Sequence, residues 1–116
     1  MNIYDNAHAL AKTLKNSEEY RSFLQAKKVV DTDEQAKKMV KEFLAKQMEL
    51  EMEMMAGKGQ DKGKTEELQK KYELILLNTK ARDFMQAHIK FQRVMSDVYK
   101  IIGESVAEGM DFFGQK

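Results

Sequence analysis

The chain of 116 residues has the length of one domain, and its 42% hydrophobic and 34% charged residues are typical of a folded globular protein, not of a disordered tail or a membrane protein. It has no cysteine, which excludes disulfides, thiolate metal sites and cysteine nucleophiles, and no proline, which suits long helices better than a β-rich fold. The chain has 20 Lys and Arg and 19 Asp and Glu, which gives a net charge of +1. This balance gives no reason to expect nucleic acid or an anionic membrane as a direct partner.

The first 30 residues predict two amphipathic helices. Apolar residues recur at helical spacing over about residues 4–15, and Ser17 is a suitable N-cap for a second helix. Glu18 and Glu19 would then lie in its first turn, at the positive end of the helix dipole. We expect four apolar side chains of this helix to point towards a core: Tyr20, Phe23, Leu24 and Val30.

A long third helix is predicted over roughly residues 32–56. Asp31, with Glu34 three residues later, resembles a capping box and is expected to start it. One stripe of this helix has heptad spacing with a single polar position: Ala36, Val40, Phe43, Gln47, Leu50 and Met54. A second stripe widens the apolar face: Leu44, Met48, Met52 and Met55.

Residues 57–64 predict the tip of a helical hairpin, because they include three glycines and no apolar side chain. Thr65 is expected to cap the following helix, with Glu66 and Glu67 in its first turn. The pairs Glu66–Lys70 and Glu67–Lys71 have the i,i+4 spacing that supports an exposed helix face.

The strongest periodicity lies between residues 65 and 105. Ten residues follow alternating spacings of 3 and 4: Leu74, Leu77, Ala81, Phe84, His88, Phe91, Met95, Val98, Ile102 and Ser105. One unbroken helix over this range would be roughly 60 Å long, too long for a compact domain of this size. Asn78-Thr79 therefore predicts a break, since both residues cap helices well.

These elements predict an all-α fold. We expect a single domain over residues 1–116, built as a helical bundle of four to five helices with a long antiparallel helical hairpin. The tail, about residues 110–116, is expected to be flexible. Residues 1–5 hold no basic stretch followed by an apolar run, so we expect no signal peptide and a cytoplasmic protein.

His88 is unusual because it lies in an apolar seam. It could be a pH-sensitive or metal-binding group. The positions three and four residues away hold Phe84, Met85, Phe91 and Gln92 and supply no further ligand, so we favour a neutral, hydrogen-bonded histidine packed like an aromatic ring. Asp5 and His8 are two potential ligands near a chain end, and we favour a solvated pair there.

The methionines of the third helix alternate with acids. We weigh core packing above a partner-binding surface, for which flexible methionines are well suited, and a metal site below both. Phe112 and Phe113 would dock on the chain's own helices or on another subunit, or else form a small exposed apolar motif. The candidate protein-interaction residues are Met48, Met52, Met55, His88, Phe112 and Phe113.

We predict neither an enzyme nor a cofactor or metal site, because no catalytic arrangement or cofactor fingerprint is visible. Direct RNA binding remains a weaker alternative, and charge balance disfavours it.

Two stretches resemble the conserved blocks of the bacterial YlbF/YmcA family. The first is carried by Glu18-Glu19-Tyr20, Ala26, the capped start from Asp31 to Ala36, Phe43 and Gln47. The second is carried by Phe84-Met85-Gln86-Ala87-His88, Phe91, Met95, Val98 and Ile102. The resemblance covers about residues 3–105, and within the family the chain is most similar to the uncharacterised YheA-like branch.

The resemblance implies an all-helical, self-associating, cytoplasmic protein of a Gram-positive-type bacterium. Better-known relatives are non-catalytic regulators of competence, sporulation and biofilm development, and form a complex that modulates the endoribonuclease RNase Y. Some carry iron–sulfur clusters on cysteines, a property that cannot apply to this cysteine-free chain.

We therefore hypothesise a non-catalytic protein-binding regulator or adaptor that modulates RNA processing or development. Its expected partners are itself, as a homodimer or higher oligomer, and other family members or an RNA-processing complex, without direct nucleic acid or membrane contact. The alternative is a structural coiled-coil-like homo-oligomer, or a small chaperone-like protein, without a dedicated regulatory partner.

Overall fold

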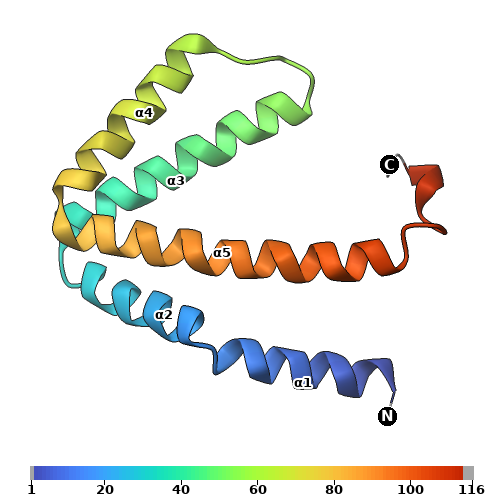
Figure 1. Ribbon diagram of the computed structural model, residues 1–116. Helices are drawn as coiled ribbons and strands as arrows, with labels where there is room; N and C mark the ends of the chain where they lie inside the picture. Colours follow the sequence, from blue (N-terminus) through green and yellow to red (C-terminus); the bar gives the residue numbers. More distant parts are fainter. Residues whose placement is uncertain (1, 114–116) are drawn as a thin grey trace.

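The computed structural model describes residues 2–113, which are helical throughout apart from short connections (Figure 1). Along the chain the elements are α1 (Ile3–Lys15), α2 (Glu18–Val30), α3 (Glu34–Met55), α4 (Lys62–Leu77), α5 (Thr79–Ser105) and a 3-10 helix η1 (Asp111–Phe113). Helices α3 and α4 run antiparallel as a hairpin, and α5 runs between this hairpin and the α1–α2 arm. The predicted all-α class with a long helical hairpin is confirmed.

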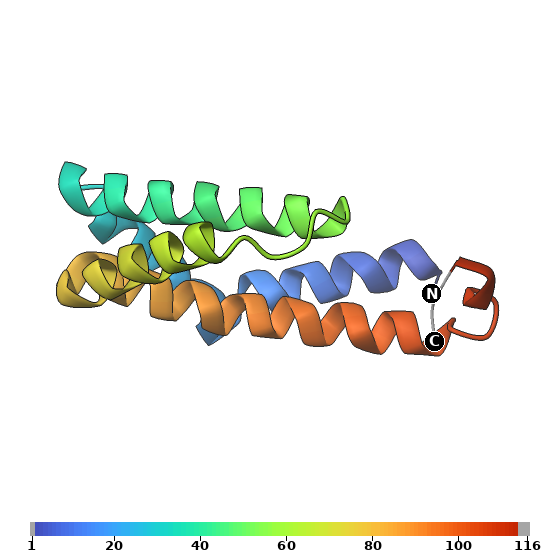
Figure 2. The ribbon, with the colours of Figure 1, turned by 90° about the horizontal axis from the view of Figure 1, so that it is seen from above.

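The core is small and lies at one end of the molecule. There α2 ends, α3 begins, α4 ends and α5 begins (Figure 1). The eight buried hydrophobic residues come from these four helices: Val30, Ala36, Val40, Phe43, Ile75, Ala81, Phe84 and Met85. From this end the helices spread into a thin molecule of 47 × 38 × 15 Å (Figure 2).

Aromatic rings join α2 to α5 beside the core. The Phe23 ring lies 5.3 Å from the Phe84 ring and 5.7 Å from the Phe91 ring, and Tyr20 lies 5.2 Å from Phe91, between ring centroids. Such aromatic pairs stabilise the fold beyond the effect of burying their apolar area. The predicted direction towards the core is confirmed for Phe23 and Val30. It is wrong for Leu24, which is 39% exposed, and Tyr20 packs on Phe91 beside the core.

The start of α2 is as predicted, whereas that of α3 is not. Ser17 caps α2 by accepting a hydrogen bond from the Tyr20 amide at 3.2 Å. Asp33, not Asp31, caps α3, because its backbone is extended, as a cap requires, and its side chain accepts from the Ala36 amide at 3.1 Å. Asp31 instead ends α2 and accepts from the Lys27 ammonium at 2.9 Å, a hydrogen bond that lowers the pKa of Asp31.

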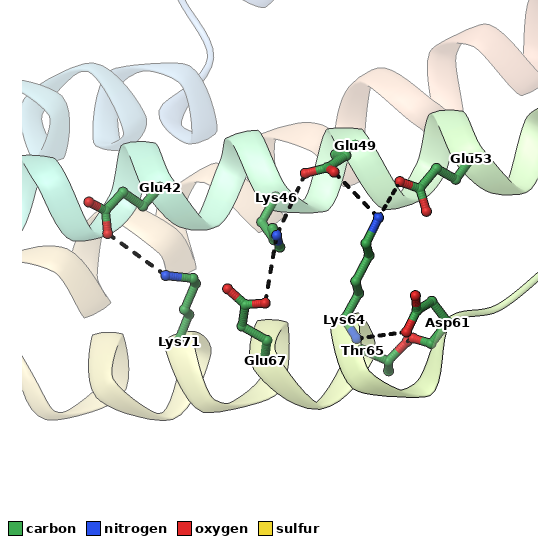
Figure 3. Close-up of polar contacts among 9 residues, drawn as sticks. All are labelled: Glu42, Lys46, Glu49, Glu53, Asp61, Lys64, Thr65, Glu67 and Lys71. Carbon is green, nitrogen blue, oxygen red and sulfur yellow. Dashed lines mark hydrogen bonds and ion pairs between the residues drawn. The ribbon is translucent and has the colours of Figure 1, made fainter.

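Helix α4 begins earlier than predicted, so the expectation that Thr65 caps it is wrong and the loop is shorter than 57–64. Asp61 is the cap, accepting from the Lys64 amide at 3.1 Å, and the Thr65 hydroxyl donates to the Asp61 carbonyl at 2.9 Å. The additional turn places Lys64 opposite α3, where its ammonium lies 2.7 Å from Glu53 and 3.5 Å from Glu49 (Figure 3).

The charged side chains of α4 pair across the hairpin instead of along their own helix. The predicted i,i+4 pairs are not formed: Glu67 lies 3.6 Å from Lys46, and Lys71 lies 3.8 Å from Glu42 (Figure 3). Each such exposed pair stabilises little, but together they align α4 with α3.

The predicted break between α4 and α5 is confirmed at Asn78. This extended residue ends α4 and caps α5, because its side chain accepts from the Ala81 amide at 3.1 Å. The seam predicted across the break is wrong on the α4 side, where Leu74 and Leu77 are 58% and 83% exposed. One non-helical residue changes the helix direction, so α4 instead packs inward a stripe formed by Leu68, Tyr72 and Ile75.

No helix in the part of the chain that the structure describes contains an 18-residue stretch apolar enough to cross a membrane.

Replacement of Asn78 tests the dual role of this residue. We expect Asn78→Ala to lower the free energy of unfolding by about 1 kcal/mol, because the first turn of α5 loses its side-chain acceptor. Urea denaturation followed by circular dichroism measures this. Asn78→Asp keeps the acceptor and should retain most of the stability, so equal losses in both variants would contradict a capping role.

Candidate functional site

An open hollow, here called the hairpin groove, lies between the α3–α4 hairpin and α5. Its volume is about 620 Å³, and it is lined by Phe43, Leu44, Gln47, Met48, Glu51, Tyr72, Met85, His88, Ile89 and Gln92. The α3 and α5 residues recur at three- and four-residue intervals, which places them on one face of each helix. Met48 and His88, distant in sequence, thus line the same hollow.

A second hollow of about 440 Å³, the methionine hollow, lies along α3 towards the hairpin loop. It is lined by Ala45, Met48, Glu49, Met52, Glu53, Ala56 and Lys58. Met48 belongs to both hollows, so the two form one continuous surface. Met55, at the end of α3, is 88% exposed and lines neither.

The methionines in the second half of α3, from Met48 to Met55, are on the surface. Met48 and Met52 are 62% and 64% exposed, so our preference for core packing is wrong. The reason is that buried contacts between α3 and α4 are concentrated near the core, where the Phe43 and Tyr72 rings lie 5.5 Å apart. Towards the loop, the ion pairs of Lys64 join the two helices and leave the methionines uncovered.

His88 packs like an aromatic residue, as predicted. Its half-buried ring lies 5.4 Å from the Phe23 ring and is stacked on Phe84 at 6.1 Å. The predicted hydrogen bond is absent at one nitrogen: within the described residues no group reaches the buried Nδ1 atom. Burial lowers the pKa of His88, which favours the neutral ring. The titratable side chains lining the same groove are Glu51 and Tyr72.

Phe112 lies far from the hairpin groove in the chain and lines neither hollow. Phe112 lies on η1 and is 94% exposed, so the prediction that it docks on the chain's own helices is wrong. Its docking on another subunit stays a prediction. The side chain of Phe113 lies outside the described part of the structure.

The sequence analysis missed several groove residues. Met85, Ile89 and Gln92 form a second stripe on α5 at spacings of 4 and 3, a signal visible in the sequence. Tyr72 lies on a stripe with the same spacings, together with Leu68 and Ile75. The sequence does not show that this stripe of α4 faces inward, because the direction of α4 depends on the break at Asn78.

Two further observations bear on chemistry. Among residues 2–113, no three His, Asp or Glu side chains gather as a possible metal site. A larger hollow of about 860 Å³ between α2 and α5 is lined mainly by polar side chains and by charges of both signs, including Glu18, Arg21, Lys80 and Asp83. That mixture is typical of a solvated surface.

Comparisons with known proteins agree over most of the chain. Residues 3–107 match the family model described as control of competence regulator ComK, YlbF/YmcA. The chain is 38% identical to a UPF0342 protein of Desulfitobacterium hafniense over 93% of this chain and 87% of that protein. It is 37% identical to a UPF0342 protein of Symbiobacterium thermophilum (95% and 98% covered) and 35% identical to one of Clostridium novyi over the full length of both.

The burial of His88 predicts a pH-dependent stability. Because its pKa is lowered from the ordinary value of 6.5 in the folded state, the unfolded chain binds more protons below that pH. The free energy of unfolding should therefore fall more steeply between about pH 7.5 and about pH 5.5 in the wild type than in His88→Phe. Denaturant titrations at both pH values measure this.

His8 is the only other histidine, so His8→Gln is a matched control that should keep the wild-type pH dependence. Identical pH dependence in the wild type and His88→Phe would contradict the expected effect of burial.

Proposed function

Because the chain belongs to the YlbF/YmcA family, whose model is described as control of competence regulator ComK, we propose that it is a non-catalytic regulator that binds other proteins through the hairpin groove. The observation that carries this proposal is the exposure of Met48 in a hollow with an apolar floor built by three helices. Assignment to the YheA-like branch stays a prediction.

The shape and composition of the groove suit an amphipathic helix. Its lining combines apolar and aromatic side chains with the polar side chains of Gln47, Glu51 and Gln92, a composition that suits the apolar face and polar border of a docking helix. The neighbouring Met52 extends the apolar surface along α3, and flexible thioether side chains adapt to partners of different shape.

The charges around the groove favour a partner with basic side chains. Two titratable side chains of the lining could carry a charge near neutral pH, Glu51 and His88, and burial favours the neutral form of His88. Glu51 forms no ion pair among the described residues. The negative end of the α3 dipole, with no basic residue in the last turn, lies nearby. A partner helix with apolar residues on one face and Lys or Arg at its border therefore fits best.

Membership of the family supports placing this activity in developmental regulation or RNA processing, in the cytoplasm of a Gram-positive-type bacterium. The proposed partners are other family members or an RNA-processing complex. The balanced charge of the chain supports contact with the proteins of such a complex, without direct nucleic acid or membrane binding.

A structural homo-oligomer or chaperone-like protein is the second candidate. It is favoured by apolar residues outside the groove, notably Phe112 and Ile101, which no regulatory partner in the groove would cover. Suppression of client aggregation at stoichiometric ratios, without recovery of a defined partner, would support it.

Crosslinked affinity purification from the native cell, with and without ribonuclease, tests the regulatory role. We expect a defined protein to be recovered after ribonuclease treatment, and its recovery to fall about tenfold or more with Met48→Gln/Met52→Gln, because two apolar contacts are lost.

Met54→Gln is a matched control, since Met54 lies on the same helix, is 59% exposed and lines neither hollow. It should leave recovery unchanged. Recovery of the chain alone, or equal recovery with all variants, would contradict the proposed groove function.

A further inference from the structure

A cluster of exposed thioethers lies on the last two turns of α3, residues 48–55, here called the outer segment of α3. Four methionines of this segment are exposed: Met48, Met52, Met54 and Met55. Met110 is also exposed but lies alone beyond α5, whereas Met85 is buried in the core. An oxidant in solution therefore meets the outer segment of α3 before it meets the core.

The sulfur chemistry of this chain is that of thioethers. It has nine methionines and no cysteine. When a peroxide reacts with a thioether, its O–O bond breaks and one oxygen atom is transferred to the sulfur. The sulfur loses two electrons and becomes a sulfoxide, and hydrogen peroxide leaves as water. The reaction needs no further protein group, so exposure decides which methionine is oxidised first.

Two of the exposed methionines belong to the surface proposed to bind a partner. Met52 lines the methionine hollow, and Met48 lines both that hollow and the hairpin groove. A sulfoxide is polar and chiral, whereas the thioether that it replaces is flexible and apolar. Oxidation therefore places hydrogen-bond acceptors in the apolar lining where the two hollows meet. Met54 and Met55 line neither hollow, so sulfoxides there leave the lining unchanged.

The fold does not depend on these thioethers. None of the four methionines belongs to the buried core or to the partly buried residues packed against it. At the outer segment, α4 is joined to α3 by the ammonium of Lys64, which lies 2.7 Å from Glu53 and 3.5 Å from Glu49 (Figure 3). Sulfoxides at Met48 and Met52 leave these ion pairs intact, so the surface changes while the hairpin stays joined.

We propose that Met48 and Met52 form an oxidation site, at which a peroxide converts two thioethers to sulfoxides and removes the partner-binding surface without unfolding the chain. Because both side chains are exposed, a methionine sulfoxide reductase has access to the products. It restores the thioether while two thiols are oxidised to a disulfide and the oxygen leaves as water. The loss of binding rests on the proposed function of the groove, whereas the selective oxidation does not.

Peptide mapping of the intact protein tests the selectivity. After treatment with hydrogen peroxide, we expect mass spectrometry to show oxidation of Met48 and Met52 at least about tenfold faster than oxidation of Met85, because reactivity follows exposure. In urea that unfolds the chain the rates should become equal. The oxidised protein should keep its helical circular dichroism, and methionine sulfoxide reductase should restore the original mass.

The partner recovered by affinity purification tests the effect on binding. Peroxide treatment of the wild type should weaken binding about tenfold or more, because two apolar side chains become polar, as in Met48→Gln/Met52→Gln. Met48→Leu/Met52→Leu has side chains of similar volume that form no sulfoxide. Peroxide should therefore not change the binding of this variant from its own untreated level. Met54→Leu/Met55→Leu is the matched control and should stay as sensitive to peroxide as the wild type.

The outcomes separate this proposal from the groove function. Selective oxidation in a chain for which no partner is recovered would contradict the groove function and would support the oxidation site. Oxidation of Met48 and Met52 no faster than that of Met85 in the folded protein would overturn the site itself. So would loss of helical structure on oxidation, or an equal effect of peroxide on the wild type and Met48→Leu/Met52→Leu.

Discussion

The arrangement of the molecule depends on one residue that is not helical. Asn78 ends α4, caps α5 through the Ala81 amide and turns the chain between them. Ile75 and Ala81, on either side of this break, are both completely buried. The break therefore lies against the core. Without it, residues 62–105 would extend as one helix, and the groove between the α3–α4 hairpin and α5 could not form.

The small core explains why so many apolar side chains of the protein are exposed. Eight buried hydrophobic residues hold four helices together at one end, and the helices then spread apart. Two apolar regions result, and they differ in construction. The hairpin groove is lined by residues of three helices, whereas α1 and the end of α5 carry exposed apolar side chains such as Ile3 and Ile102.

The hairpin shows how charge and apolar packing divide their roles. Near the core, Phe43 packs against Tyr72, and further out the ammonium groups of Lys46 and Lys64 join acids of both helices (Figure 3). Ion pairs at the surface contribute little free energy, but they align the helices without burying apolar side chains. This arrangement leaves Met48 and Met52 available on the outer part of α3.

The sequence was sufficient for local structure. Composition and periodicity identified the helices, and short-range capping chemistry identified the starts at Ser17 and Asn78, because a cap involves residues only three positions apart. Where several acids compete, as at Asp31 and Asp33, backbone conformation decided which one caps, and the pattern of residue types did not reveal it. The resemblance to the YlbF/YmcA family also came from such local patterns.

Burial depended on the path of the whole chain. Periodicity shows which side chains share a face of a helix, but whether that face is covered depends on where the other helices run. Leu77 and Met48 lie on regular apolar stripes and are exposed, whereas Ile75, outside the predicted seam, is completely buried. The change of direction at Asn78 and the spreading of the helices from one small core produce these differences, and both are properties of the assembled fold.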